Sequence, residues 1–76
     1  MKELSCVITS PLDRENIVFE IWSGTRQVAE VSHEPNCPIE IEIYSAPENG
    51  IWKFGLDEFK AMLEKAIVNL QNNDNH

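Results

Sequence analysis

Residues 38–44, PIEIEIY, constrain the fold more than any other segment, because apolar and polar side chains alternate in it without a break. Strict alternation with β-branched residues is the pattern of a strand that buries one face. Such a strand needs neighbouring strands and a cover for its apolar face, so the segment predicts a sheet with one buried and one open side. The predicted inner face carries Ile39, Ile41 and Ile43, and the predicted outer face carries Glu40, Glu42 and Tyr44.

Three earlier segments alternate in the same way and predict further strands, namely residues 3–10, 16–22 and 26–32. Short segments rich in proline, glycine and polar residues separate them, which indicates tight antiparallel turns. Residues 51–54, IWKF, follow an Asn-Gly turn dipeptide and are the candidate for a fifth strand.

The register between the second and third strands follows from keeping apolar residues on one side. A three-residue loop at 23–25 pairs Phe19 with Ala29 and Ile17 with Val31 on the inner face, whereas a two-residue loop would exchange the faces. The three-residue loop is therefore predicted, and the next hairpin is expected to place Glu30 beside Glu42 or Glu40. The predicted outer pairs are Trp22 with Arg26, Glu20 with Val28, and Val18 with Glu30.

Residues 56–70 predict one amphipathic helix, because their apolar side chains recur at helical spacing. Gly55 is its predicted N-cap, and the acidic residues in its first turn suit the positive end of the helix dipole. Phe54 and Phe59 have the spacing of a hydrophobic staple.

Together these elements predict an α+β fold, with an antiparallel four- to five-stranded meander sheet and one C-terminal helix packed on one face. The chain has 76 residues, which is the size of one domain. The domain is expected to span residues 1–70, and the polar segment 71–76 is expected to be a disordered tail. The helix is predicted to cover the face that carries Ile17, Phe19, Ile41 and Ile43.

The charge of the chain excludes several classes of partner. Its net charge is −7, from 13 acidic and 6 basic residues, so it repels phosphate backbones and anionic membranes. The natural complement is a basic protein. The sequence has no apolar run of about 18 residues, as a transmembrane helix requires, and residues 1–10 lack the apolar core of a signal peptide. A cytoplasmic protein is therefore expected.

His33 and Cys37 share one short loop, but the sequence does not support chemistry there. A catalytic thiol would need an imidazole partner and an oxyanion hole. A structural zinc site needs about four ligands, and the sequence has only two cysteines and two histidines, with no C-x-x-C pair. A flat sheet face is also a poor active site. We expect no enzyme activity, no metal and no cofactor, and two reduced thiols, at Cys6 and Cys37.

The open sheet face is the candidate binding site. Carboxylates complement basic groups, and tryptophan and tyrosine are frequent anchors of protein interfaces. An ordinary solvated face of an acidic protein is the competing interpretation. The candidate partner-binding residues are Glu20, Trp22, Glu30, Glu40, Glu42 and Tyr44.

Residues 28–66, "VAEVSHEPNCPIEIEIYSAPENGIWKFGLDEFKAMLEKA", resemble a pattern of small bacterial proteins. In it Val-Ala-Glu is followed by alternating Ile and Glu, then Trp-x-Phe, then Leu-Asp-Glu-Phe at a helix start. The pattern is similar to immunity proteins of polymorphic or contact-dependent toxin systems. The resemblance implies a catalytically silent protein that neutralises a basic toxin, often a nuclease, by direct binding. The alternatives are a phage-derived anti-defence inhibitor and a homodimeric structural module that pairs through its open face or an edge strand.

Overall fold

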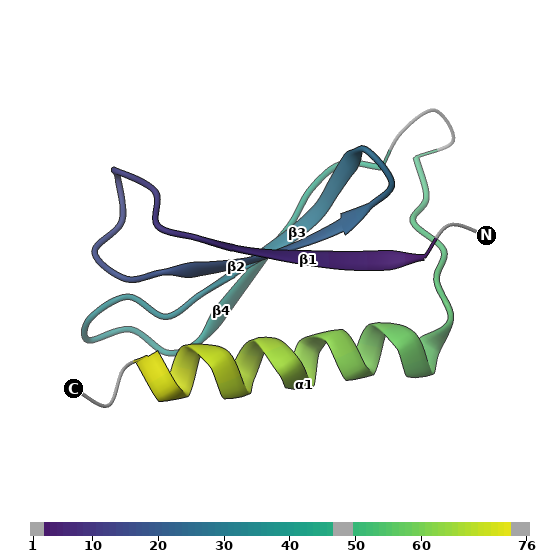
Figure 1. Ribbon diagram of the computed structural model, residues 1–76. Helices are drawn as coiled ribbons and strands as arrows, with labels where there is room; N and C mark the ends of the chain where they lie inside the picture. Colours follow the sequence, from purple (N-terminus) through teal and green to yellow (C-terminus); the bar gives the residue numbers. More distant parts are fainter. Residues whose placement is uncertain (1–2, 47–49, 74–76) are drawn as a thin grey trace.

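The computed structural model describes residues 3–46 and 50–73. Over these residues the chain forms one antiparallel sheet in the order β1-β2-β3-β4 and one C-terminal helix (Figure 1). The predicted α+β meander is confirmed, with four strands, because residues 51–54 do not form a strand. The elements are β1 (Leu4–Thr9), β2 (Val18–Ser23), β3 (Arg26–Ser32), β4 (Glu40–Ile43) and α1 (Leu56–Asn73).

The start of α1 follows the predicted pattern. The carbonyl of Gly55 accepts the N–H of Phe59 at 3.0 Å, which is the first hydrogen bond of the helix. The ring of Phe54 stacks on Phe59 and on Trp52, with centroids 5.6 Å apart in each pair. The aromatic stack therefore fixes the direction in which the chain enters the helix. The helix continues through Asn73, into the segment predicted as a tail, and the rest of that segment lies outside the described residues.

The turn between β2 and β3 is shorter than predicted. Ser23 pairs with Arg26, so the loop has two residues, Gly24 and Thr25, and the three-residue prediction is wrong. Gly24 has a φ of 62°, in the left-handed region that a side chain disfavours. Glycine at the first position of a two-residue loop gives the turn the twist that neighbouring strands need.

The two-residue turn alone would have placed Ala29 and Val31 on the outer face, and a β-bulge in β3 keeps them on the inner face. The pairing shifts between Ile21 and Trp22, and Val28 is the extra residue on β3. Beyond the bulge Ile21 pairs with Ala29, and Phe19 with Val31. Beyond the bulge the predicted partners are therefore wrong by two residues, and the predicted inner face is kept. Val28, predicted on the outer face opposite Glu20, is instead buried in the core.

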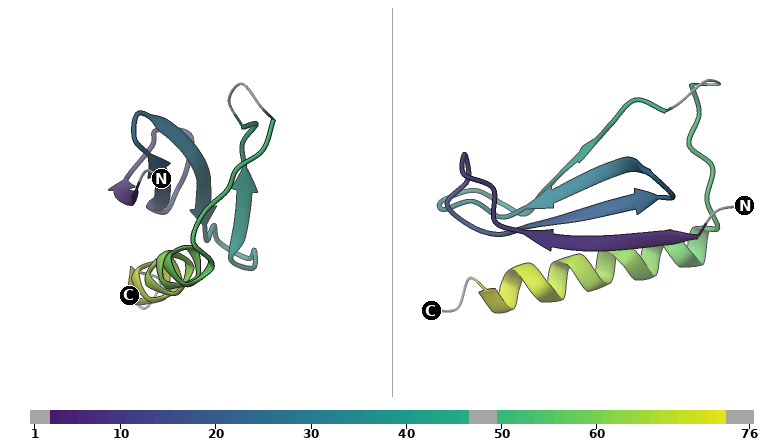
Figure 2. Two further views of the ribbon diagram at one scale, coloured as in Figure 1. Left: turned by 90° about the vertical axis from the view of Figure 1, so that its right-hand side faces the viewer. Right: turned by 45° about the horizontal axis from the view of Figure 1, so that its top comes forward.

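The helix covers one half of the sheet and leaves the other half open. Its contacts are mainly with β1 and β2, and the end view in Figure 2 shows it beneath the β1 side, with β4 at the far side. Ile41 and Ile43 remain 42% and 62% exposed, so the prediction that the helix covers them is wrong. A helix is about 10 Å wide and strands lie about 4.8 Å apart, so one helix covers about two strands. The buried hydrophobic core comprises Leu4, Phe19, Ile21, Val28, Ala29, Val31, Ala66 and Leu70.

The β1–β2 and β3–β4 connections are joined at one end of the sheet. The Glu34 carboxylate accepts the backbone N–H groups of Glu15 at 2.9 Å and Asn16 at 3.0 Å. The side-chain amide of Asn16 in turn donates to the carbonyl of His33. The Glu15 hydrogen bond, helped by that of Asn16, lowers the pKa of Glu34 against its partial desolvation.

The outer face is not open along its whole length, contrary to the prediction. Val18 lies on this face opposite Ser32, and both are buried, at 0% and 5% exposure. Alternation correctly assigned Val18 to the outer face. It could not show that this end of the face is closed to solvent, because closure depends on how the two connections fold.

Candidate functional site

Three glutamates form a straight row across the outer face of the sheet. Glu20 on β2 lies directly opposite Glu30 on β3, and Glu30 lies directly opposite Glu42 on β4. The predicted neighbourhood of Glu30 and Glu42 is confirmed, and the bulge adds Glu20 to it. Like charges in directly opposed positions destabilise a sheet by about 0.2–1 kcal/mol per pair. We call Glu20, Glu30 and Glu42 the glutamate row.

Arg14 from the β1–β2 connection binds two members of the row at once. Its Nη2 lies 2.6 Å from Glu30 Oε2 and 3.0 Å from Glu42 Oε1. The sequence pattern predicted only a turn in this segment and gave Arg14 no role in the site. A single cation in a short loop beside acidic strands was the available signal.

Burial and charge act together on Glu30, whose side chain is 13% exposed. Desolvation raises the pKa of its carboxyl, Glu42 and Glu20 raise it further, and Arg14 only partly opposes them. Desolvation followed by the charges of Glu30 and Glu42 likewise raises the pKa of the Tyr44 hydroxyl. The row therefore holds more negative charge than Arg14 offsets.

The two predicted aromatic anchors occupy different positions. The indole Nε1 of Trp22 donates to Glu20 Oε1 at 3.0 Å, which holds the half-buried ring beside the glutamate row. Tyr44 follows β4 and is 38% exposed, and its carbonyl accepts the indole N–H of Trp52 at 2.9 Å. Trp22 thus belongs to the site, while Tyr44 marks its border.

Glu40 stands apart from the glutamate row. It lies opposite the buried Ser32, is exposed, and contributes to the rim of a groove at the free edge of β4. The structure therefore brings together Glu20, Trp22, Glu30 and Glu42 from the predicted set, and places Glu40 and Tyr44 at the margins.

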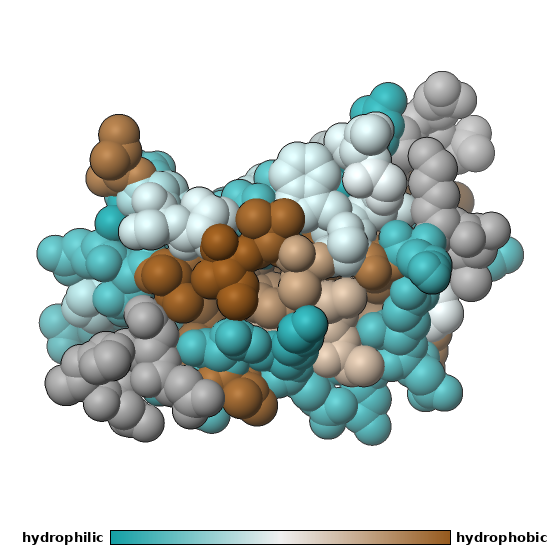
Figure 3. All heavy atoms as spheres, viewed as in Figure 1, coloured by the Kyte–Doolittle hydropathy of each residue, from teal (hydrophilic) through white to brown (hydrophobic). Residues whose placement is uncertain are grey.

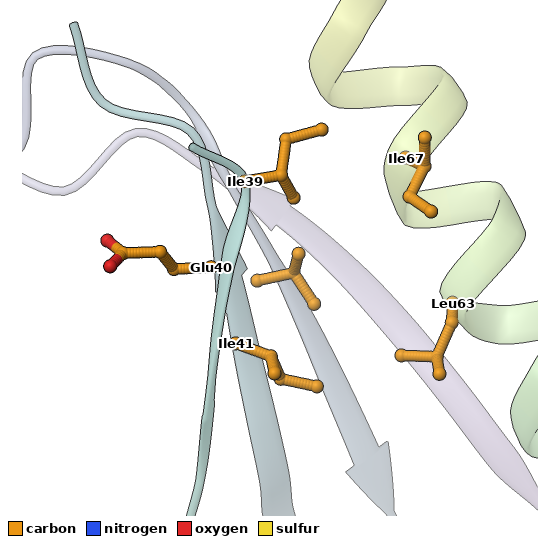
Figure 4. A pocket seen from close by; sticks show the side chains of 6 residues that line it. Ile39, Glu40, Ile41, Leu63 and Ile67 are labelled. Atoms are coloured by element: carbon orange, nitrogen blue, oxygen red, sulfur yellow. The ribbon is translucent and has the colours of Figure 1, made fainter. Parts of the chain in front are cut away.

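An apolar groove between β4 and α1 was not predicted. It has a volume of about 180 Å³, and hydrophobic side chains gather between the sheet and the helix on the face shown in Figure 3. In Figure 4, Ile39 and Ile41 point toward Leu63 and Ile67 on the helix, whereas Glu40 points away. The apolar members of this set were predicted to lie in the core. The groove is lined by Val31, Ile39, Glu40, Ile41, Leu63 and Ile67.

The residues considered for chemistry are scattered. Cys6 packs half-buried against the core, Cys37 is exposed, and both are free thiols. Within residues 3–46 and 50–73, no three His, Cys, Asp or Glu side chains are grouped so that they could hold a metal ion. In the same part of the chain, no helix is long and apolar enough to cross a membrane.

Comparisons with family models, with curated proteins and with solved structures give no match to this chain. The class that fold and surface define is a small α+β domain with an acidic outer face.

Proposed function

We propose that this chain is a non-catalytic protein-binding domain that acts as an immunity protein, neutralising a basic toxin domain by direct contact. The glutamate row is the observation that carries the proposal. Three carboxylates in directly opposed positions weaken the sheet, and Arg14 pairs with only two of them. A partner that brings cations to this face would relieve the repulsion that the folded chain retains.

The surroundings of the row support the same function. The net charge of −7 steers a basic partner toward the chain over a distance set by ionic strength. Trp22 lies beside Glu20 and offers a large apolar surface of the kind that dominates interface energies. We therefore expect an association rate that falls steeply with added salt, because the Debye length is only about 8 Å at physiological ionic strength.

The test is co-expression with the toxin domain encoded beside its gene, followed by growth and affinity measurements on the purified pair. Charge reversal at Glu30 and Glu42 is a poor choice, because it would surround Arg14 with cations and break both ion pairs. The double variant Glu40→Lys/Glu42→Gln changes the charge at the exposed edge and keeps a hydrogen-bond acceptor for Arg14. It should bind at least about tenfold more weakly at low salt.

The matched control is Asp57→Asn/Glu64→Lys, which changes the net charge equally at two exposed helix positions. It should have a much smaller effect, because its charges lie away from the row. Equal losses in both variants, or no loss in the first, would show that the outer face is only a solvated surface.

The absence of catalysis has its own test. His33→Ala and Cys37→Ser should each protect cells as well as the unaltered chain, provided that thermal unfolding shows both variants folded. Loss of protection in either folded variant would contradict a purely binding function.

A further inference from the structure

We propose that the free edge of β4 binds an extended segment of the partner as an added strand, and that this segment alternates apolar with basic residues. The proposal rests on the proposed function, since it specifies how a basic partner is recognised. It combines three features of one place in the fold: an unpaired strand edge, an apolar groove on its inner side, and two glutamates on its outer side.

The backbone of β4 presents hydrogen-bonding groups outward. β4 is the last strand in the sheet order, so no described strand pairs with its second edge. The N–H of Tyr44 donates to the carbonyl of Val28 at 2.9 Å, which shows that this N–H points toward β3. Because these directions alternate along an antiparallel strand, the N–H and C=O groups of Ile41 and Ile43 point away from β3. An exposed edge of this kind is a template for one more strand.

The side chains on the two faces of β4 specify what the added strand carries. Residues that alternate toward the inner face would meet Ile41 and Ile43, which are 42% and 62% exposed, and would fill the groove against Leu63 and Ile67. Residues that alternate toward the outer face would lie beside Glu40 and Glu42, both exposed. Lysine or arginine complements those carboxylates, so the expected pattern is apolar, basic, apolar, basic.

The same glutamates disfavour the other occupants. In a pair of β4 edges from two copies of this chain, Glu40 and Glu42 would oppose glutamates of the second copy, which destabilises the pairing. The free edge of β1 lacks this charge, because its outer face carries Ser5, Val7 and Thr9. Charge thus selects a basic strand, and selects β4 as its position.

The probe is a capped synthetic peptide, Lys-Val-Lys-Ile-Lys-Val-Lys, added to the labelled protein and followed by NMR. Binding should slow hydrogen exchange at the amides of Ile41 and Ile43, which face the open edge. The control peptide Lys-Lys-Val-Ile-Val-Lys-Lys has the same composition without alternation and should bind at least about tenfold more weakly, because it cannot place apolar and basic groups on opposite faces. N-methylation of one alternate set of peptide nitrogens should weaken binding by about tenfold or more, and of the other set by much less.

Two protein variants localise the binding. Ile67→Asp places a charge in the groove and should abolish peptide binding, whereas Val68→Asp, at an exposed neighbouring position outside the groove, should not. Ile43→Pro removes an edge N–H without removing a hydrogen bond to β3, and should also abolish binding.

Three results would overturn the inference. The first is a peptide affinity that does not change with the order of the residues or with N-methylation. The second is slowed amide exchange in β1 and not in β4. The third is a dimer of this chain alone that Ile43→Pro dissociates. If the toxin still binds Ile43→Pro and Ile67→Asp but is lost with Glu40→Lys/Glu42→Gln, the inference fails and the proposed function stands. If the peptide binds as expected but the toxin domain does not, strand addition stands and the immunity function fails.

Discussion

Arg14→Ala tests whether charge on the outer face limits the stability of this fold. Arg14 bridges Glu30 and Glu42, and its side chain and that of Glu30 are 22% and 13% exposed. Exposed ion pairs contribute about 0.2–1 kcal/mol, and breaking a buried pair costs about 3–5 kcal/mol. For this partly buried site we expect a loss of about 1–2 kcal/mol at neutral pH. In a domain of this size that loss lowers the melting temperature by roughly 4–15 °C.

The pH dependence separates charge from packing. The pKa of Glu30 in the folded chain is already above its ordinary value of 4.5, and removing Arg14 raises it further. A carboxyl with a raised folded pKa favours folding when it is protonated, and that contribution is lost as the pH rises through the folded pKa. The difference in unfolding free energy between the two proteins should therefore be largest at neutral pH and shrink as the pH falls through the raised folded pKa of Glu30.

Glu30→Gln provides the second half of a double-mutant cycle, because it removes the charge and keeps the shape. Adding it to Arg14→Ala should restore at least about half of the lost stability, since the row then holds one carboxylate fewer. Urea unfolding across the pH range measures all four proteins. A difference that does not change with pH, or a double variant no more stable than Arg14→Ala, would mean that Arg14 acts by packing the loop and would refute the electrostatic argument.

Three further predictions follow from the burial pattern and the loops. Ile43→Thr should cost less than about 1 kcal/mol in urea unfolding, whereas Phe19→Ala, which empties a fully buried position, should cost about 3–5 kcal/mol; similar costs would mean that the helix covers β4. Glu34→Gln should lower the hydrogen-exchange protection factors of the Glu15 and Asn16 amides at neutral pH, and the unaltered protein should show the same loss of protection on acidification. Acid has this effect because the pKa of Glu34 is lowered in the folded chain, so the stability that the carboxylate contributes is lost as the pH falls through that pKa. Protection that changes neither with the substitution nor with acid would show that the carboxylate does not hold the loop. Cys37, which is exposed, should react with a thiol reagent in the native state well before the half-buried Cys6, as mass spectrometry of single-cysteine variants can measure, and the reverse order would contradict the placement of the two thiols.

The order and type of the elements could be predicted because they depend on local periodicity. Alternation in residues 38–44 and helical spacing in residues 56–70 each define an apolar face within one segment. The Phe54–Phe59 contact and the start of α1 are local for the same reason. Register was less accessible, since a two-residue turn and a bulge together kept the faces that a three-residue loop also kept.

Local sequence patterns are therefore enough to predict an acidic α+β meander and, except for Val28 at the bulge, the face to which the paired strand residues point. Which of those faces are covered depends on contacts between segments far apart in the chain. Arg14 lies far along the chain from Glu30 and Glu42, and nothing in the local pattern of either segment specifies that they meet. The apolar groove arises because one helix is too narrow to cover four strands. The helix packs on β1 and β2 and leaves the inner face of β4 largely uncovered. The position of the helix against β1 and β2 leaves Ile41 and Ile43 uncovered beside the free edge of β4.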